Sequence, residues 1–297
     1  MTEPTPPIAF SISPDAVGEQ FAGGSSVDDA VIEQLKKVCS TSVDDADRAE
    51  HGRDWWPLAM HWALAGKTPR KPHAVCRPKN TDEVVAIVNI CRQHNIALTT
   101  SGGRSGVCGS AVPMFGGVVL DTTQLAGVVS VDQVSGIVEV LPGTFGPDME
   151  NELQSKYGIT VGHFPQSFDI ATVGGWVACR GAGQFSTRYG KIEDMVVALE
   201  VVLADGSVIR TGGAPAAATG SDITHLFVGS EGTLGVITRV WLRAHPKATY
   251  EKRAAYLFPS FEDGIAACRD AVRKEATPAV LRLYDEIESQ RSHGLDG

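Results

Sequence analysis

The sequence predicts an α+β fold, and three observations support this. A short apolar run, Ala74 to Arg77, is followed by a helical pattern and a second apolar run, Ile96 to Thr100, which together make a β-α-β unit. Strand-like runs then outnumber helical patterns as far as residue 244. A second unit of the same kind follows Pro246. A mixed fold of helices and sheets is therefore expected.

Size and charge restrict the function. The chain has 297 residues, enough for about two domains with a sizeable core. Lys and Arg number 26 against 35 Asp and Glu, so the formal net charge is −9. Nucleic acid and anionic membrane surfaces are therefore poor partners, and a small-molecule substrate is expected.

Neither a signal peptide nor a membrane helix is visible. Residues 1 to 20 contain no Lys or Arg, so they lack the basic start of a secretion signal. The most apolar stretch, Met195 to Ala204, is too short to cross a bilayer. We therefore expect a cytoplasmic protein without an integral membrane segment.

Residues 1–65 are expected to form an N-terminal extension that contains one helix. Ser26 and Asp29 have the spacing of a capping box, and the apolar positions after them predict a helix through about Cys39. Tryptophans follow at positions 55, 56 and 62. Packing against another domain is their expected role, and stacking on a substrate or cofactor is the alternative.

The central part of the chain alternates short strands with turns. Asn80 and Glu83 have capping-box spacing and begin the helix of the first β-α-β unit. Ala204-Asp205-Gly206 is a hairpin turn signal between two of the later strands. The predicted later strands are Gly117–Asp121, Gly136–Leu141, Val196–Leu203, Ser207–Thr211 and Gly235–Leu242.

The last predicted unit consists of a strand at Ala254–Phe258, a helix capped by Ser260 and Asp263, and a strand at Ala279–Tyr284. A single β-α-β unit leaves one face of its sheet uncovered. We therefore expect the domain that begins near residue 248 to be incomplete.

Several enzyme classes are excluded by missing motifs. The six cysteines are dispersed with no C-x-x-C pair, so zinc sites and disulfide frameworks are disfavoured, no metal is expected, and buried cytosolic thiols are the prediction. The chain contains no H-E-x-x-H or G-x-S-x-G, and Ile192 follows Gly190-Lys191 where a phosphate loop needs Ser or Thr. Zinc peptidases, serine hydrolases and P-loop nucleotidases are excluded.

A glycine-rich loop, Thr100 to Ser110, directly follows a predicted strand. Glycines allow consecutive amides to turn inward and cradle a pyrophosphate, so a dinucleotide is the natural ligand. The Rossmann fingerprint is the obvious competitor, but that motif continues into a helix, whereas this loop continues into Val112-Pro113. A plain surface turn is the alternative for this loop taken alone.

Three further glycine-bearing segments follow, at residues 165–176, 178–183 and 229–237. Each could be a tight turn. Together with the first loop they have one composition and are separated by short strands, which indicates an extended ligand contacted at several points.

The order of these features resembles a known family. A β-α-β opening, SGGRSG, ATVGGW, RYGKIEDMV (residues 188–196) and SEGTLGVIT are similar to the FAD-binding domain of the FAD-linked oxidase superfamily of the vanillyl-alcohol oxidase, or PCMH, type. Within it the chain most resembles the N-terminal half of the alkylglycerone-phosphate synthase (alkyldihydroxyacetonephosphate synthase) family. The resemblance implies a PCMH-type FAD-binding domain of two α/β subdomains over residues 66–247, and the incomplete start of an α/β substrate-binding cap domain over residues 248–297.

The same resemblance implies the cofactor contacts. For the FAD pyrophosphate it indicates Thr100, Ser101, Gly102, Gly103, Arg104, Ser105 and Gly106, with Gly109 and Ser110 in the same loop. For the flavin and ribityl chain it indicates Gln166, Ser167, Phe168, Asp169, Ile170, Ala171 and Thr172, with Gly174 and Gly175 beside them. The third contact would be Ala178, Cys179, Arg180 and Gly181. The adenine-side contact would be Glu231, Gly232, Thr233, Leu234, Gly235, Val236 and Ile237.

Two positions depart from the synthase pattern: Arg104 stands where the family has a glycine, and Gly106 where it has a serine. Arg104 either forms a salt bridge with a phosphate or folds outward. In related berberine-bridge-like oxidases the Arg104 position is a histidine bonded to the flavin. Arginine does not form that bond as histidine does, and residues 162–175 contain no cysteine, so the resemblance implies non-covalent FAD.

Three other residues have two interpretations each. His163 is either an acid or base near the flavin or a hydrogen-bonded structural histidine, and we do not nominate it. Asp169 is expected to accept a hydrogen bond from the flavin or ribityl chain rather than act as a base. Arg282 falls where the synthases carry an arginine near the active site, so it either contacts a substrate anion or is a surface residue. The catalytic residues are unknown.

The expected function is that of an FAD-binding oxidoreductase-type flavoprotein, with flavin N5 chemistry on an alcohol or hydroxy acid. One alternative is an alkylglycerone-phosphate synthase-like transferase in ether lipid synthesis. The other is a non-catalytic FAD-binding fragment. The expected partners are a small-molecule substrate and no nucleic acid, with a homodimer or a missing C-terminal half as further alternatives.

Overall fold

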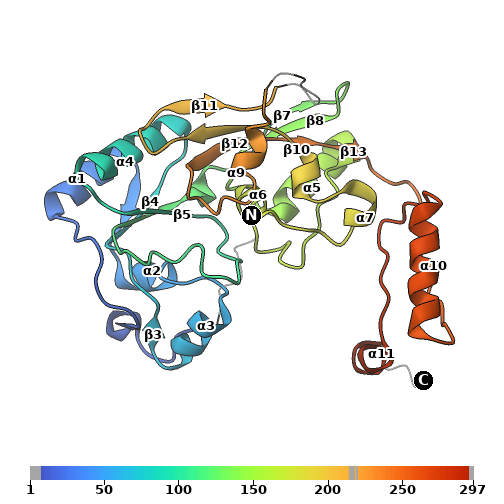
Figure 1. Cartoon of the computed structure of the whole chain (residues 1–297). Coiled ribbons are helices and arrows are strands. Elements are labelled where there is room, and N and C mark those ends of the chain that lie inside the picture. Colours follow the sequence, from blue (N-terminus) through green and yellow to red (C-terminus); the bar gives the residue numbers. More distant parts are fainter. Residues whose placement is uncertain (1–7, 214–217, 219, 294–297) are drawn as a thin grey trace.

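The computed structural model describes residues 8–213, 218 and 220–293 (Figure 1). Two sheets form its main body, as the PCMH-type resemblance implies. The first has the strand order β2-β4-β6-β5, in which β4 and β5 pair parallel with β6, and β2 pairs antiparallel with β4. Helices α1 and α4 share one hydrophobic core with this sheet. The bounds are α1 Asp29–Val38, β2 Ser40–Ser42, β4 Ala74–Arg77, α4 Thr81–Gln93, β5 Leu98–Ser101 and β6 Val118–Asp121.

The second sheet is antiparallel, with the order β11-β10-β12-β8-β7. Its core includes Met149 and Leu153 of α5 and Trp176 of α6. Val202 and Val236 of this sheet reach the first core, so the two subdomains pack directly on each other. The bounds are β7 Val128–Asp132, β8 Ile137–Val140, α5 Gly146–Tyr157, α6 Val173–Cys179, β10 Val196–Val202, β11 Val208–Arg210 and β12 Val236–Arg243.

Short elements complete the described body. Two pairs of strands lie outside the main sheets: β1 Gly18–Glu19 with β3 Lys67–Thr68, and β9 Ile159–Thr160 with β13 His245–Pro246. The 3₁₀ turns are η1 Pro14–Ala16 and η2 Thr122–Gln124. The remaining helices of this part are α2 Asp45–Glu50, α3 Pro57–Leu64, α7 Ser186–Tyr189, α8 Ile192–Met195 and α9 Thr224–Phe227.

The first β-α-β unit and its helix cap are as predicted. Asn80 Oδ1 accepts from the Glu83 amide at 2.9 Å, and Glu83 Oε2 accepts from the Lys79 amide at 2.8 Å. The two parallel strands of the unit flank β6. The later strands and the hairpin at Ala204–Gly206 are also confirmed.

The N-terminal prediction is partly wrong. The first helix begins two residues later than expected, and its N-cap is Asp28. Ser26 lies outside the helix because Ser25 is bridged to Gly116, which holds this part of the chain extended. Trp56 and Trp62 meet edge to face with 5.2 Å between ring centroids, a contact within the N-terminal extension. The expected packing on another part of the chain is supported for Trp56, whose ring lies 3.2 Å from a Cβ placed at Gly109.

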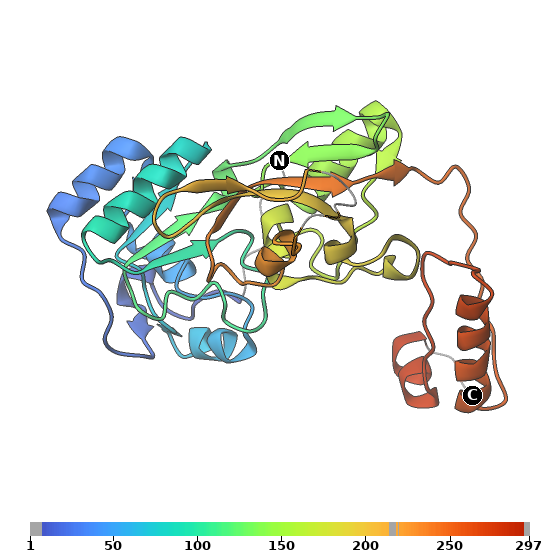
Figure 2. The same ribbon diagram turned by 45° about the horizontal axis from the view of Figure 1, so that its top comes forward.

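The last β-α-β prediction is correct only for its helix. The helix α10, Phe261–Arg273, is capped by Ser260, whose Oγ accepts from the Asp263 amide at 3.1 Å. Residues 254–258 and 279–284 form no strand, because they pair with no other strand among the described residues. Helices α10 and α11 (Glu286–His293) lie beside the body rather than on it in both views (Figures 1 and 2).

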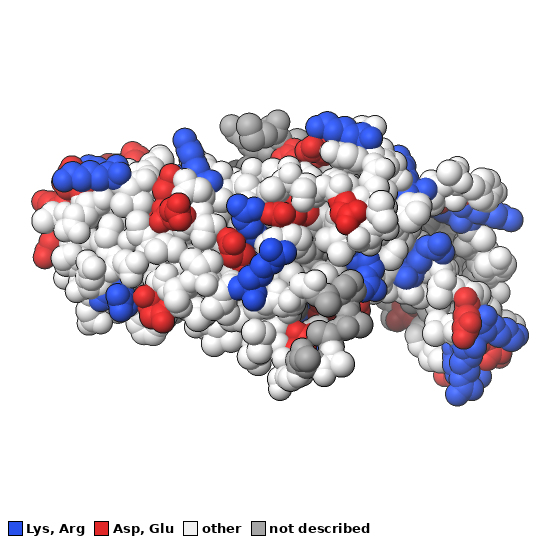
Figure 3. Space-filling model, turned by 90° about the horizontal axis from the view of Figure 1, so that it is seen from above, with Lys and Arg blue, Asp and Glu red and all other residues white. Residues whose placement is uncertain are grey.

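Two surface properties follow from the structure. On the face seen in Figure 3, acidic and basic side chains are interspersed rather than gathered by sign. No helix in the described part of the chain has the length and apolar character that crossing a membrane requires.

All six cysteines are free, but the expectation of buried thiols is correct only for Cys76 and Cys91. Cys39 and Cys268 are half-buried. Cys108 and Cys179 are exposed, because both lie in glycine-rich segments at the surface.

Candidate functional site

The first glycine segment, which follows β5, is in direct contact with the second. A Cβ atom added at Gly103 would lie 2.1 Å from the carbonyl oxygen of Ile170. One added at Gly102 would lie 2.4 Å from Oγ1 of Thr172. Both distances are shorter than any real Cβ contact, so this close approach of the two segments requires glycine.

The other two segments join the same surface. A Cβ at Gly232 would lie 3.6 Å from that of Thr100, which places the fourth segment against the first. The Glu231 amide donates to the Ala178 carbonyl at 3.0 Å, which places the fourth segment against the third. The structure therefore brings all four glycine-bearing segments together.

The predicted residues differ in exposure. Ser110, Gln166, Asp169, Cys179, Arg180, Glu231, Thr233 and Leu234 are exposed. Ser101, Ala171, Thr172, Val236 and Ile237 are buried. Thr100, Gly102, Gly103, Arg104, Ser105, Gly106, Gly109, Ser167, Phe168, Ile170, Gly174, Gly175, Ala178, Gly181, Gly232 and Gly235 are half-buried. Val236 and Ile237 belong to the two hydrophobic cores, so only their backbones remain available to a ligand.

The first segment offers unpaired backbone donors. None of the amides from Gly102 to Cys108 donates a hydrogen bond to an acceptor in the described part of the chain. By contrast, the first-turn amides of α6 are all used: Val173 donates to Thr144 at 2.9 Å, Gly174 to Pro142 at 2.7 Å, and Gly175 to the Thr172 hydroxyl at 3.4 Å. A run of free amides is the arrangement that binds an anionic group such as a pyrophosphate.

Backbone strain also gathers here. Among the described residues, five that are not glycine have a positive φ, and three of them are Arg104, Arg180 and Glu231, with φ of 54°, 56° and 51°. They lie in the first, third and fourth segments. Such conformations cluster at functional sites because the surrounding structure must hold them.

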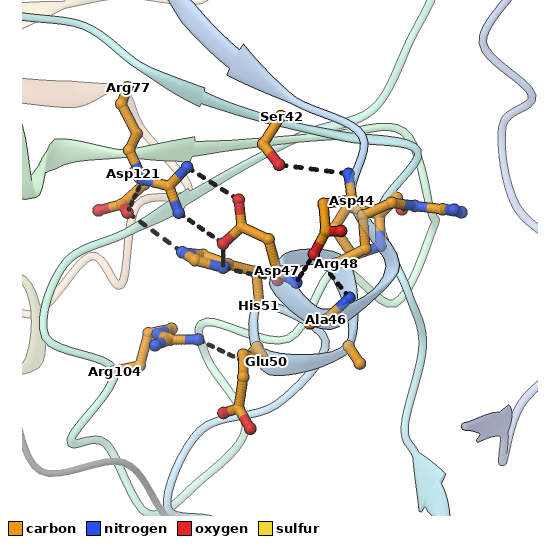
Figure 4. Close-up of polar contacts among 12 residues, drawn as sticks. Ser42, Asp44, Ala46, Asp47, Arg48, Glu50, His51, Arg77, Arg104 and Asp121 are labelled. Atoms are coloured by element: carbon orange, nitrogen blue, oxygen red, sulfur yellow. Dashed lines mark hydrogen bonds and ion pairs between the residues drawn. The ribbon is translucent and has the colours of Figure 1, made fainter. Parts of the chain in front are cut away.

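Arg104 does not fold outward. Its side chain turns toward α2, and Nη1 donates to the backbone carbonyl of Glu50 (Figure 4). Burial lowers the pKa of the Arg104 guanidinium, but an arginine side chain stays protonated in proteins.

Arg104 belongs to a group of ionised side chains near the first segment. We call this group the charge cluster, and its members are Asp47, His51, Arg77, Arg104 and Asp121. Figure 4 shows Arg77 and His51 between the two carboxylates. Asp47 comes from α2, Arg77 from β4 and Asp121 from the end of β6.

The carboxylates of the cluster are stabilised in their charged form. Burial alone would raise the pKa of Asp121, but the hydrogen bond from His51 lowers it below its ordinary value. Burial likewise opposes the His51 and Arg77 hydrogen bonds that lower the pKa of Asp47. His51 shows the converse: burial would lower its pKa, and the bonds to Asp121 and Asp47 raise it.

The sequence analysis missed this cluster because its members come from four separate elements and form no motif. Two signals were available. Asp47 and His51 have the i, i+4 spacing of helix neighbours, and Asp121 ends an otherwise apolar run.

His163 is fully buried, and neither ring nitrogen has a hydrogen-bond partner among the described residues. The described residues therefore supply no partner for the hydrogen-bonded structural interpretation. Its nitrogens lie near the third segment, 3.5 Å from a Cβ placed at Gly181 and 3.3 Å from one at Gly183.

Arg282 is exposed at a hollow of about 280 Å³ beside the second and third segments. The hollow is lined by Gln166, Ala182, Gly183, Gln184 and Arg282. A larger hollow of about 460 Å³ lies over α1 and is lined by none of the predicted site residues.

Residues 72–212 match the family model described as an FAD binding domain. Alkyldihydroxyacetonephosphate synthase of Trypanosoma brucei brucei is 34% identical over 276 residues, which cover 88% of this chain and 43% of the synthase. Glycolate oxidase subunit GlcD of Bacillus subtilis is 35% identical, over 86% of this chain and 53% of the subunit. The chain thus spans about half the length of the curated relatives it matches.

Solved structures show the same fold. An alkyldihydroxyacetonephosphate synthase structure matches 98% of this chain with a TM-score of 0.84 and 26% identity, and the match covers 52% of that chain. p-Cresol methylhydroxylase matches 82% of this chain with a TM-score of 0.68, over 48% of its own length. At 23% identity the second match shows the fold alone.

Proposed function

The chain belongs to the FAD-linked oxidase superfamily of the vanillyl-alcohol oxidase, or PCMH, type, and from that premise we propose that it binds FAD non-covalently across its four glycine-bearing segments to oxidise an alcohol or hydroxy acid. The observation that carries the proposal is the run of unpaired amides from Gly102 to Cys108, beside segments packed too closely for any side chain at Gly103. These residues fit the pyrophosphate of a dinucleotide.

The remaining contacts follow from the shared surface. Residues 166–172 would run along the flavin and ribityl chain, and residues 178–181 would make the third contact. Backbone groups of residues 231–237 would face the adenine side, since the side chains of Val236 and Ile237 are buried in the cores. Two features of the sequence support a non-covalent link. Arg104 stands where related oxidases carry the histidine that is bonded to the flavin, and residues 162–175 contain no cysteine.

Bound FAD supplies two-electron redox chemistry, and the protein supplies binding, orientation and charge. Arg282 is the cation of the hollow beside the second segment, and a guanidinium there suits a substrate carboxylate or phosphate. A hydroxy acid is supported by two relatives named for such substrates, the glycolate oxidase subunit and a D-lactate dehydrogenase of Anaerostipes hadrus that is 29% identical.

An alkylglycerone-phosphate synthase-like transfer in ether lipid synthesis is the second candidate. It is favoured by the synthase relative and by the synthase structure. The two candidates differ in net redox change. Glycolate or D-lactate should bleach the flavin absorption of the loaded protein under anaerobic conditions if it is an oxidoreductase, whereas a transferase should give no net bleaching with either acid.

The whole-protein activity also depends on the half of the relatives that the chain does not span. A non-catalytic FAD-binding fragment would bind FAD and remain oxidised with every substrate. Loaded protein that is bleached by a hydroxy acid would contradict that alternative.

The location of the site is tested by a matched pair of glycine substitutions. Gly103→Ala places a methyl group 2.1 Å from the Ile170 oxygen, so it should abolish FAD binding, measured by quenching of flavin fluorescence. Gly18→Ala meets nothing closer than 3.8 Å and should bind FAD like the parent protein. FAD binding by Gly103→Ala with unchanged affinity would refute the site.

A further inference from the structure

His51 has a defined protonation state in the charge cluster. Its Nδ1 lies 2.8 Å from the backbone carbonyl oxygen of Asp47, and its Nε2 lies 3.1 Å from Oδ2 of Asp121. A carbonyl oxygen and an ionised carboxylate only accept hydrogen bonds. Both ring nitrogens must therefore carry hydrogen, which makes His51 an imidazolium.

The charges in the cluster do not cancel. Arg77 binds both oxygens of Asp47 at 2.8 and 2.6 Å, and its Nε donates to Asp121 at 3.1 Å. Two cations, His51 and Arg77, thus match two carboxylates. Arg104 adds a third cation, and its hydrogen bond goes to a backbone carbonyl rather than to a carboxylate. The cluster carries one excess positive charge.

Two carboxylates, Glu50 and Asp54, lie near the charge cluster without belonging to it. Glu50 is paired with Arg53 at 2.6 Å, which adds no net charge. Asp54 lies close to the first glycine segment, since its Oδ2 is 3.6 Å from a Cβ placed at Gly106, and burial raises the pKa of its carboxyl. Asp54 contacts no member of the charge cluster by a hydrogen bond or ion pair among the described residues, so it is not counted in the charge of the cluster.

The charge cluster adjoins the first glycine segment, whose amides have no acceptor among the described residues. Asp121 pairs in register with Ser101, the last residue of β5, which precedes Gly102. The Thr122 hydroxyl donates to the Ser101 carbonyl at 3.0 Å. Arg104 itself belongs to the glycine segment. His51 is therefore linked to the proposed pyrophosphate contacts through Asp121, whose strand partner Ser101 directly precedes Gly102.

From this arrangement we infer that His51 is a positioning residue for the dinucleotide, which as an imidazolium fixes Asp47 and Asp121 and leaves one excess positive charge under the pyrophosphate-binding segment. The inference rests on the proposed function, because it needs the pyrophosphate at residues 102–108. Loss of the His51 proton would leave the cluster neutral and weaken the attraction for a dianionic pyrophosphate.

The direction of the pH effect follows. Burial and the positive charge of Arg104 would lower the pKa of His51, but the hydrogen bonds to Asp121 and Asp47 outweigh them and raise it, so the imidazolium persists above the usual range of histidine. FAD affinity should then be high at low pH and fall as the pH rises through that pKa. Linkage requires the reverse effect as well: a bound pyrophosphate should raise the pKa of His51 further.

The first test measures the Kd of FAD from about pH 6 to about pH 9 at constant ionic strength. The parent protein should lose about fivefold or more in affinity across this range, a typical coupling between two sites. His51→Gln should bind weakly with little pH dependence. His61→Gln, which changes an exposed histidine of α3, should follow the parent. A purely structural role would lower the melting temperature of His51→Gln but leave its pH slope like that of the parent, and that result would overturn the inference.

The second test needs no variant, so it stands even if His51→Gln does not fold. The His51 ring is titrated by NMR in protein with ¹³C-labelled histidine, alone, with FAD, and with riboflavin, which lacks the pyrophosphate. The inference predicts a higher His51 pKa with FAD than with riboflavin. An identical pKa in both would contradict it.

The two proposals fail separately. If Gly103→Ala binds FAD normally, the proposed site is wrong. If Gly103→Ala loses FAD and the His51 pKa still does not respond to FAD, the site stands and only the role of His51 is wrong.

Discussion

The ring of His163 packs edge to face against Trp176, with 4.8 Å between the ring centroids, in an interior where neither His163 nitrogen has a partner among the described residues. An imidazole in this position is an uncharged aromatic side chain at neutral pH. Burial accordingly lowers its pKa to about 4.

This contact predicts a stability loss in acid. The unfolded chain binds a proton at His163 near pH 6.5, whereas the folded protein does so only near pH 4. The stability that the folded protein gains from an uncharged His163 is therefore complete above pH 6.5. As the pH falls toward 4, the free energy of unfolding decreases by about 3 kcal/mol. Urea unfolding at several pH values should show a smaller acid loss for His163→Phe than for His61→Phe. An equal loss in both variants would contradict the assignment.

Glu150 of α5 predicts a second stability effect. Its buried carboxylate accepts from the Thr160 hydroxyl at 2.8 Å and from the Val161 amide at 2.9 Å. Glu150→Ala leaves these donors unpaired in the interior, so it should lower the free energy of unfolding by about 2 kcal/mol or more. Glu152→Ala removes only the ion pair with Lys156 at the surface of the same helix and should cost less than about 1 kcal/mol. Equal losses would show that the buried contacts contribute nothing.

Cys39 is predicted to be a reactive thiol. The hydrogen bond from Cys76 lowers the pKa of Cys39, despite the opposing effect of burial. The Thr41 hydroxyl lies 3.6 Å from the Cys39 sulfur and 3.5 Å from that of Cys76. Because the thiolate is the nucleophile, iodoacetamide at pH 7 should label Cys39 faster than Cys268, which is also half-buried. Peptide mass spectrometry measures both rates, and faster labelling of Cys268 would disprove the prediction.

Much of the fold could be predicted because local signals agreed with it. The cap at Asn80, the alternating strands and the hairpin at residues 204–206 each depend on contacts within a few residues. The strand β7 and the short β2 were missed, because a strand forms only where a distant neighbour pairs with it. The same reason explains why Ala254–Phe258 and Ala279–Tyr284 are not strands despite their strand-like composition.

Part of the candidate site could be predicted from the sequence and part could not. Glycine spacing predicted the four segments, because close backbone approach demands glycine at positions such as Gly103. The charge cluster could not be predicted, since the contact between His51 and Asp121 joins residues 70 positions apart. The direction of Arg104 also depended on a helix, α2, that the sequence analysis did not identify.

The central claim is that this chain holds FAD without a covalent bond. The most direct measurement is the visible absorption spectrum of the protein loaded with FAD, before and after precipitation with acid. We expect a bound-flavin spectrum that passes entirely into the supernatant on precipitation. Flavin retained in the pellet would contradict the non-covalent link, and a protein that stays colourless with FAD would contradict binding itself.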